Sequence, residues 1–155
     1  MVRERPAATG GAAAVTPPPA DLVLLYDGLC GFCNRTVRFI LTRDPGGTMR
    51  FAPLQGEFAR DLLARRPELS RVDSLILVDH AGRPGEEHVA THSEAVLRIW
   101  NYVGGPWRVV NLLRLAPRPL RDWGYDRFAR FRYRLFGRFD SCPIPAADVR
   151  ARFID

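Results

Sequence analysis

The spacing of apolar positions changes several times along the first half of the chain, and each change marks a new element. Residues 22–26 (LVLLY) form a continuous apolar run, as expected for a short strand buried on both faces. The Asp-Gly pair at 27–28 ends that run. Across 33–43 the apolar residues recur at helical spacing until a Pro-Gly-Gly stop at 45–47, which predicts a helix of about three turns.

The same reasoning predicts the later elements. We expect strands over 49–52, 74–78 and 87–90, a helix over 58–66, and a helix capped by Ser93 that runs through Trp100. This order, βαβαββα, places a mixed sheet between helices and predicts an α/β sandwich. Helices over 107–115 and 120–139 then form a C-terminal helical extension packed on the domain.

The chain of 155 residues is the usual size of one domain, and its 46% hydrophobic content can supply one core. Residues 1–20 contain mostly small residues, glycine and proline, so we expect a disordered leader. The predicted domain covers 21–145, including the C-terminal helices, and 146–155 form a C-terminal tail.

The net charge of +6 comes from 23 basic residues, all of them arginine. Arginine, alanine, glycine and proline together are typical of a GC-rich genome, so the charge by itself does not identify an acidic partner. No apolar stretch reaches the roughly 18 residues that would span a bilayer, and the start lacks the apolar core of a signal peptide. We therefore expect a soluble, cytoplasmic protein.

Candidate chemistry lies where the first strand meets the first helix, at Cys30-Gly31-Phe32-Cys33. This position puts Cys30 at the helix N-cap and Cys33 inside the first turn. Free N–H groups and the positive end of the helix dipole favour a thiolate at Cys30, which makes it the candidate nucleophile. Cys33, one turn further and more covered, is the candidate resolving thiol.

Asp27 precedes Cys30 by three residues. It has two possible roles: assisting the chemistry by accepting a proton from Cys33, or simply forming the turn before Gly28. The cysteine pair also has two other interpretations. It could be half of a zinc site or a pair of inert core thiols, although only Cys142, His80, His88 and His92 could complete a zinc site.

At these residues the sequence resembles the DCC family of thiol–disulfide oxidoreductase-like proteins, through its Asp27-x-x-Cys30-x-x-Cys33 motif. Further similarity lies in the strand before it, in the strand at 73–78, in Ser93-Glu94-Ala95 and in 133–138. The resemblance implies a thioredoxin-like fold and an oxidoreductase activity. Thioredoxin-like enzymes usually carry a cis-proline before the strand facing the cysteines, but 71–74 contains none, so substrate docking is expected to differ.

The predicted last helix carries arginines on one side, at Arg127, Arg130, Arg134 and Arg138. An adjacent apolar stripe contains Phe128, Phe131, Leu135 and Phe139. The first interpretation is an amphipathic helix with its aromatics on the sheet and its arginines in water. The alternative is a docking surface for an acidic partner, a membrane or nucleic acid.

Taken together, these features predict a thiol–disulfide oxidoreductase that exchanges its Cys30/Cys33 dithiol with substrate disulfides, without bound cofactor or metal. Its expected partners are protein or small-molecule disulfides and an external thiol reductant. We expect neither nucleic acid nor a membrane surface as partner. The rival hypothesis is a thioredoxin-like binding module that uses the arginine- and aromatic-rich helix, with the thiols idle or bound to zinc.

Overall fold

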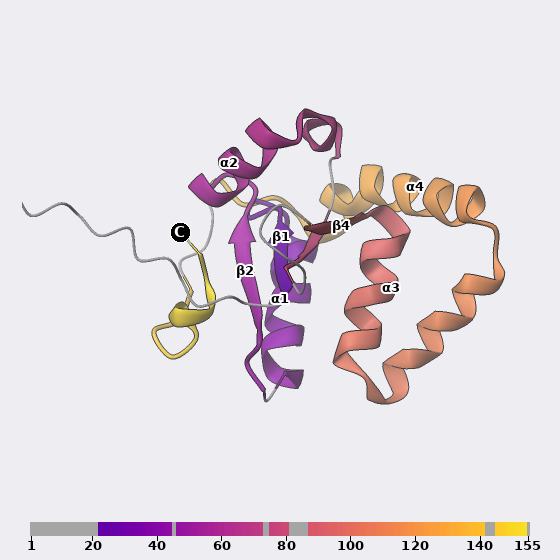
Figure 1. Ribbon diagram of the computed structural model, residues 1–155, viewed down its shortest axis with the longest axis horizontal. Helices are drawn as coiled ribbons and strands as arrows, with labels where there is room; N and C mark the ends of the chain where they lie inside the picture. Colours follow the sequence, from indigo (N-terminus) through magenta and orange to yellow (C-terminus); the bar gives the residue numbers. More distant parts are fainter. Residues whose placement is uncertain (1–21, 45, 73–74, 81–86, 142–144, 155) are drawn as a thin grey trace, which may run out of the picture.

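The computed structural model describes residues 22–44, 46–72, 75–80, 87–141 and 145–154. The leader at 1–20, Cys142 and the end of the 71–74 segment lie outside these residues. Four strands form one sheet in the order β2-β1-β3-β4 (Figure 1). Their bounds are β1 Leu22–Tyr26, β2 Met49–Pro53, β3 Ile76–Asp79 and β4 His88–Thr91. Strand β1 is parallel to β2 and antiparallel to β3, and β3 is antiparallel to β4, so the predicted mixed sheet is confirmed.

The α-helices are α1 Gly31–Arg43, α2 Glu57–Arg65, α3 His92–Val103 and α4 Arg118–Phe136. The 3-10 helices are η1 Pro67–Arg71, η2 Gly105–Leu115 and η3 Arg150–Arg152. The predicted order βαβαββα followed by helices is confirmed, with element ends displaced by a few residues, as helix ends commonly are. Within the described ranges, no helix is both long and apolar enough to cross a lipid bilayer.

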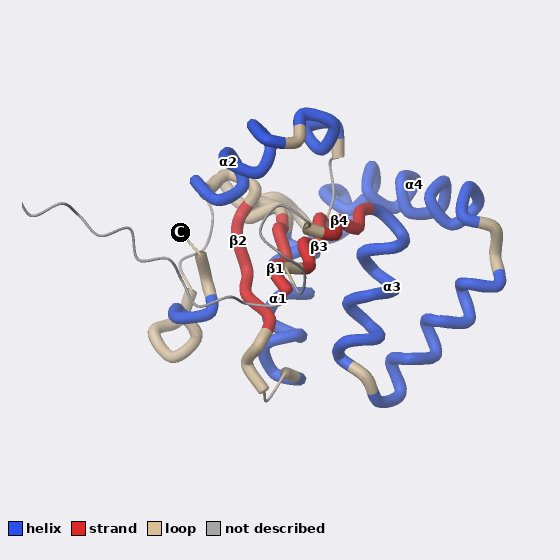
Figure 2. The backbone as a smooth tube through the Cα atoms, viewed as in Figure 1, coloured by secondary structure: helices blue, strands red, loops and turns tan. Residues whose placement is uncertain are grey.

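Alternation along β1 divides the core into two layers, because successive side chains of a strand point to opposite faces. Leu24 and Tyr26 pack with buried residues of α1 and α3, whereas Val23 and Leu25 pack with those of α2 and η1. The sheet thus lies between helices on both faces, which is the expected α/β sandwich (Figure 2). This arrangement is consistent with a thioredoxin-like fold.

Two local predictions were wrong in detail. The N-cap of α3 is Thr91, not Ser93, and the Ser93 hydroxyl donates to Asp122 of α4 instead of capping the helix. The segment expected as a helix over 107–115 is helical, but as the 3-10 helix η2. Ser93 has its partner on α4, which the local sequence could not show, and η2 packs along α3.

Part of the segment 146–155, which the sequence analysis expected as a C-terminal tail, contacts the edge strand β2. Phe153 forms a parallel bridge with Phe51, and the N–H of Ile154 donates to the Phe51 carbonyl at 2.8 Å. The ring centroids of Phe51 and Phe153 lie 5.4 Å apart. Arg152 forms an ion pair with Asp44, just past the end of α1. These contacts attach residues 150–154 to β2, the neighbour of strand β1, which leads into the cysteine pair.

Candidate active site

The turn between β1 and α1 places Cys30 at the helix N-terminus. Cys30 is the N-cap of α1 in an extended conformation, and its Sγ accepts the backbone N–H of Cys33 at 3.4 Å. Its own N–H donates to the Asp27 carbonyl at 3.1 Å. The side chain of Asn34 donates to the carbonyls of Gly28 and Cys30, which holds the turn against the helix. The predicted positions of both cysteines are therefore confirmed.

The two thiols have opposite electrostatic environments. A hydrogen bond from the Cys33 thiol, opposed by burial and aided by backbone N–H groups and the charge of Arg132, lowers the pKa of Cys30 to about 6. That same hydrogen bond, with burial, raises the pKa of Cys33 far above the ordinary thiol value. Near neutral pH the pair consequently holds one thiolate, at Cys30, and one proton, at Cys33.

Burial does not distinguish the two cysteines as the sequence predicted. Cys30 is 0% exposed and Cys33 is 1% exposed, so Cys33 is not the more covered residue. The chain after α4 runs over the turn: Gly31 N–H donates to the Gly137 carbonyl at 3.2 Å, and Phe139 N–H donates to the Leu29 carbonyl at 2.8 Å. Arg138 forms an antiparallel bridge with Cys30 itself. We call residues 137–139 the covering segment.

Gly31 is required by this close approach. A Cβ at residue 31 would lie 2.2 Å from the backbone oxygen of Phe136, well inside contact distance. Any larger residue would push the end of α4 and the covering segment away from the cysteines. The residue after Cys30 therefore controls how tightly the C-terminal chain packs on the site.

Asp27 is buried beside the cysteines, at 5% exposed. Its Oδ1 accepts the N–H of Leu29 and the side-chain amide of Gln55, each at 3.0 Å. Its Oδ2 accepts the hydroxyl of Tyr133 and lies 3.5 Å from Nη2 of Arg132. Asp27 thus forms the turn, as one interpretation held, and also connects that turn to α4.

Arg132 and Tyr133 are site residues that sequence reasoning did not assign. Arg132 is 2% exposed, and its Nη2 donates to the Tyr133 hydroxyl at 3.0 Å. Burial opposes its charge, but the hydrogen bond to Tyr133 and the nearby thiols raise the pKa of Arg132 above its ordinary value. A permanent positive charge therefore lies within electrostatic reach of both sulfurs. Helical spacing could have placed Arg132 on the inward face of the last helix, because it lies four residues from each of the inward-facing Phe128 and Phe136.

Of the two stripes predicted on the last helix, the exposed arginine stripe is confirmed, but the apolar stripe is wrong for three of its four residues. Arg127, Arg130, Arg134 and Arg138 are all exposed. However, Phe131, Leu135 and Phe139 are also exposed, at 37%, 68% and 45%. The face that packs on the site carries Phe128 and Phe136, whose rings lie 4.8 Å and 5.0 Å from that of Phe32.

The histidines do not join the cysteines. His88 is exposed on β4, His92 pairs with Asp126 of α4, and His80 lies 3.8 Å from Glu87. Among the residues that the structure describes, no three His, Cys, Asp or Glu side chains are grouped as metal ligands would be. Cys142, the remaining candidate ligand, is outside those residues.

A mixed sheet between helices, with a Cys-x-x-Cys pair at the start of the first helix, is consistent with a thioredoxin-like protein. Residues 24–138 match the family model described as DCC1-like thiol-disulfide oxidoreductase. The chain belongs to this family. Its membership supports a general thiol–disulfide oxidoreductase role.

Two curated relatives cover most of the chain. It is 35% identical over 133 residues to the uncharacterized protein YuxK of Bacillus subtilis, covering 85% of this chain and 93% of that protein. It is also 35% identical over 124 residues to a chloroplastic DCC family protein of Arabidopsis thaliana, covering 79% of this chain and 69% of the relative. No solved structure matches the chain.

Proposed function

We propose that the protein exchanges the dithiol of Cys30 and Cys33 with substrate disulfides. The observation that carries this proposal is the position of two cysteine sulfurs at the N-terminus of α1, where the Cys30 Sγ accepts the Cys33 N–H. Hydrogen bonds and the helix end favour the thiolate at Cys30, the form that attacks disulfides. Its lowered pKa keeps that form present at neutral pH.

In the first step, the Cys30 thiolate attacks one sulfur of the substrate disulfide. The substrate S–S bond breaks, a mixed disulfide forms with Cys30, and the other substrate sulfur leaves as a thiolate that takes a proton from water. Because Cys30 is covered, the substrate must displace the covering segment at 137–139 to reach it. The vacated backbone groups of Leu29 and Gly31 would then be free to pair with a peptide substrate.

In the second step, Cys33 loses its proton and attacks the Cys30 sulfur. The mixed disulfide breaks, the second substrate sulfur leaves as a thiolate that takes up the proton released by Cys33, and the protein is left with a Cys30–Cys33 disulfide. Two electrons have passed from the dithiol to the substrate, and an external thiol reductant returns them. The raised pKa of Cys33 holds it protonated until the negative charge of Cys30 is consumed in the mixed disulfide.

Asp27 and Arg132 would assist this exchange through their charges, without contacting the substrate. The negative charge of Asp27 is among the causes that raise the pKa of Cys33, so its carboxylate acts on the Cys33 proton through its electric field. Arg132 lowers the pKa of Cys30 and forms the ion pair with Asp27. We assign Asp27 the assisting role for proton transfer, and Arg132 the stabilisation of the thiolate.

Reduction of a model disulfide by the protein tests this function. In a Cys142→Ser background, the dithiol protein should reduce 5,5′-dithiobis(2-nitrobenzoate) and finish as an internal disulfide, releasing two thiol equivalents. Cys33→Ser should stop at a mixed disulfide visible by mass spectrometry, and Cys30→Ser should lose the fast reaction. Retention of full reactivity in folded Cys30→Ser protein would refute the assignment.

Metal analysis of freshly purified protein tests the rival hypothesis of a zinc-binding module. Stoichiometric zinc that disappears on substituting either Cys30 or Cys142 would support the rival, because a closed zinc site needs all of its ligands. We expect metal-free protein with two reactive thiols at Cys30 and Cys33.

A further inference from the structure

The covering segment pairs with the active-site turn in one defined register. The N–H of Gly31 donates to the carbonyl of the segment's first residue at 3.2 Å, and the N–H of its third residue donates to the Leu29 carbonyl at 2.8 Å. These two bonds lie on either side of the bridge between Cys30 and Arg138. Cys30 and Arg138 therefore form a non-hydrogen-bonded antiparallel pair, the kind in which opposite side chains approach most closely.

This pair has the geometry that a disulfide needs. In a non-hydrogen-bonded antiparallel pair, the two opposite Cα atoms lie about 4.5 Å apart and their side chains share one face of the ladder. Disulfides join residues whose Cα atoms are about 4.4 to 6.8 Å apart and whose Cβ atoms face each other. A cysteine at the position of Arg138 would therefore lie where its sulfur can bond to that of Cys30.

Position 138 is open to solvent, although the residue opposite to it is not. Arg138 is exposed, whereas Cys30 is 0% exposed. The Arg138 guanidinium lies 5.7 Å from the ring centroid of Tyr133. A thiolate attacks a disulfide along the S–S axis, so the leaving half of a substrate must extend away from Cys30. The space that the Arg138 side chain occupies could hold that leaving half.

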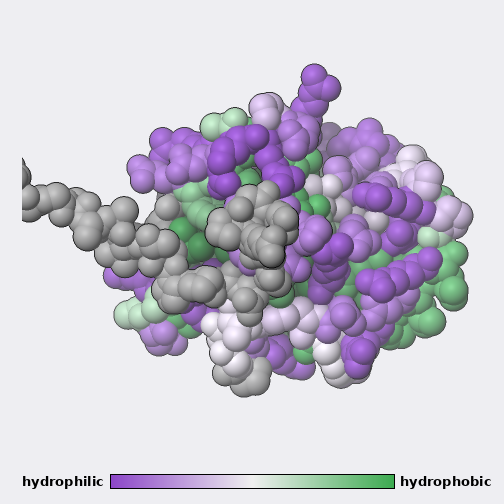
Figure 3. Space-filling model, in the orientation of Figure 1, coloured by the Kyte–Doolittle hydropathy of each residue, from purple (hydrophilic) through white to green (hydrophobic). Residues whose placement is uncertain are grey.

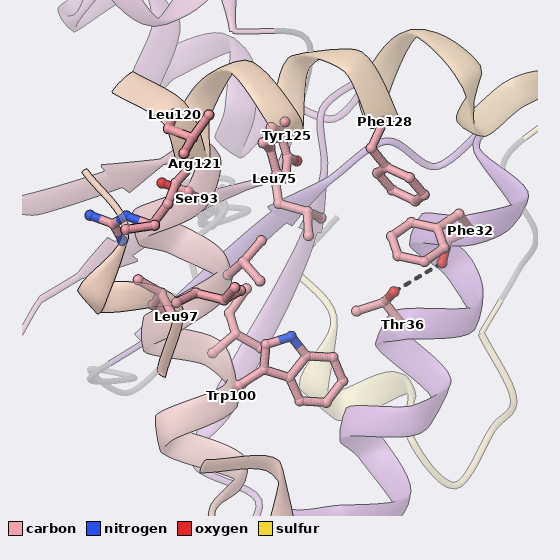
Figure 4. A pocket seen from close by; sticks show the side chains of 15 residues that line it. Phe32, Thr36, Leu75, Ser93, Leu97, Trp100, Leu120, Arg121, Tyr125 and Phe128 are labelled. Atoms are coloured by element: carbon pink, nitrogen blue, oxygen red, sulfur yellow. Dashed lines mark hydrogen bonds between the residues drawn. The ribbon is translucent and has the colours of Figure 1, made fainter. Parts of the chain in front are cut away.

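The covering segment can be displaced without moving α4. All three of its residues are exposed, so side-chain burial contributes little to its hold on the turn. Helix α4 is anchored on α1 separately, because the Phe32 ring packs on those of Phe128 and Phe136. Figure 4 shows Phe128 of α4 facing Phe32 of α1. Release of the segment therefore breaks mainly its backbone hydrogen bonds and leaves the wall beside Cys33 in place.

Backbone groups dominate recognition next to Cys30. Most of the large exposed apolar side chains lie on η2 and at the start of α4, the end of that helix opposite to the covering segment, and they include Leu112, Leu113, Leu115 and Trp123. Figure 3 shows hydrophobic surface gathered at the end of the molecule formed by η2. The N–H and carbonyl groups of the turn can pair with any extended peptide, whatever its side chains.

We propose that Cys30 acts on disulfides of extended polypeptide segments, and that the substrate's half-cystine takes the place of Arg138 opposite Cys30. This substrate class rests on the dithiol exchange proposed above. The carbonyl before the substrate cysteine accepts the Gly31 N–H, and the N–H after it donates to the Leu29 carbonyl. The Cys30 thiolate forms the new S–S bond, the substrate S–S bond breaks, and the other half leaves as a thiolate that takes a proton from water. The covering segment is the internal competitor of the substrate.

A pentapeptide disulfide tests this register. The peptide acetyl-Phe-Gly-Cys-Phe-Asp-amide copies residues 136–140 with cysteine in place of Arg138, and it carries 5-thio-2-nitrobenzoate on its sulfur. N-methylation of the residue after the cysteine removes the N–H that would donate to Leu29, and it should slow release of the chromophore about 2- to 10-fold, the effect of one lost hydrogen bond. Reaction of each peptide with dithiothreitol corrects for intrinsic reactivity.

The matched control is the same peptide N-methylated on the cysteine itself. In a non-hydrogen-bonded pair, the N–H of the central residue points away from the partner strand, so its loss should change the rate less than about twofold. Both modified peptides carry one added methyl group on the backbone. A difference between them therefore reports the register of pairing.

Cross-linking within the protein tests the same register without a substrate. In a Cys33→Ser, Cys142→Ser background, Arg138→Cys should form a disulfide with Cys30 when diamide removes two electrons and two protons from the two thiols. Phe139→Cys is the control, because neighbouring residues of a strand point to opposite faces, and it should cross-link at least about 10-fold more slowly. Mass spectrometry after alkylation with iodoacetamide gives both rates.

The proposal is overturned if the two N-methylated peptides react equally fast, or if Phe139→Cys cross-links as fast as Arg138→Cys. Reduction of 5,5′-dithiobis(2-nitrobenzoate) separates this proposal from the general function. Protein that reduces this small disulfide but does not distinguish the peptides retains the exchange activity and refutes the substrate assignment. Protein that reduces neither refutes the dithiol exchange, and this proposal with it.

Discussion

The hydroxyl of Tyr133 donates a hydrogen bond to the carboxylate of Asp27, which lies 106 residues earlier in the chain. Burial and this bond to a carboxylate raise the pKa of Tyr133 to about 12, so its proton stays in place across the physiological range. Through this contact and the Arg132–Asp27 ion pair, α4 holds the turn that carries Cys30. The last helix is thus part of the site rather than an appendage to it.

The contact between the thiols predicts a graded response to substitution of Cys33. Its thiol is the largest cause of the lowered Cys30 pKa, so Cys33→Ala should move that pKa upward from about 6, and Cys33→Ser should move it less because a hydroxyl still donates. The alkylation rate of Cys30 should therefore rise with pH through about 6 in the parent and at higher pH in Cys33→Ala. Iodoacetamide kinetics in a Cys142→Ser background measure this, and superimposable pH profiles would contradict the assignment.

The buried ion pair predicts strong coupling between Arg132 and Asp27. Arg132→Met leaves a buried carboxylate without its cation and should cost about 3–5 kcal/mol of unfolding free energy, the usual effect of breaking a buried pair. The double variant with Asp27→Asn should cost much less than the sum of the single substitutions. Urea denaturation of all four proteins checks this. Simple additivity would show that the two side chains do not interact.

The close approach at Gly31 predicts that Gly31→Ala opens the site. Its Cβ would collide with the Phe136 oxygen, so the covering segment must shift, at a cost of about 1–3 kcal/mol typical of overpacking. Alkylation of Cys30 should become faster as its cover loosens. Gly46→Ala is the control, because a Cβ there makes only ordinary contacts, with atoms of Asp44 and Thr48 at 3.7 and 3.9 Å. If Gly31→Ala is as stable and as slowly alkylated as the control, residues 137–139 do not limit access.

The exposed arginines of α4 predict little effect on folding when neutralised together. Replacing Arg127, Arg130 and Arg134 by Gln keeps helix propensity and removes exposed charges, together with the contacts of Arg127 and Arg134 with the exposed Phe131 ring. It should change stability by less than about 1.5 kcal/mol. Arg138 is left in place because its guanidinium lies 5.7 Å from the ring centroid of Tyr133, a residue of the site. Cosedimentation with phosphatidylglycerol vesicles should be absent in both parent and variant. Salt-sensitive binding by the parent, lost in the variant, would instead favour the docking interpretation.

The sequence by itself determined the elements around the cysteines. The apolar run of β1, the Asp-Gly turn and the helical spacing after Cys33 are local signals, and they placed Cys30 at the N-cap of α1 correctly. A helix start depends on neighbouring residues and on their free N–H groups, so a few positions are enough to predict it. The opposite pKa directions of Cys30 and Cys33 follow largely from that placement.

Only the tertiary structure decided what surrounds the cysteines. In the sequence, nothing separates Arg132 from the other arginines of a basic helix. Packing nevertheless buries Arg132 beside Asp27 and leaves the apolar Leu135 exposed. The covering segment follows a helix that begins almost ninety residues after Cys30, and Phe153 returns to pair with β2. Periodicity shows which residues share a face of one element, but not which element that face meets. That choice depends on long-range packing between elements far apart in the chain.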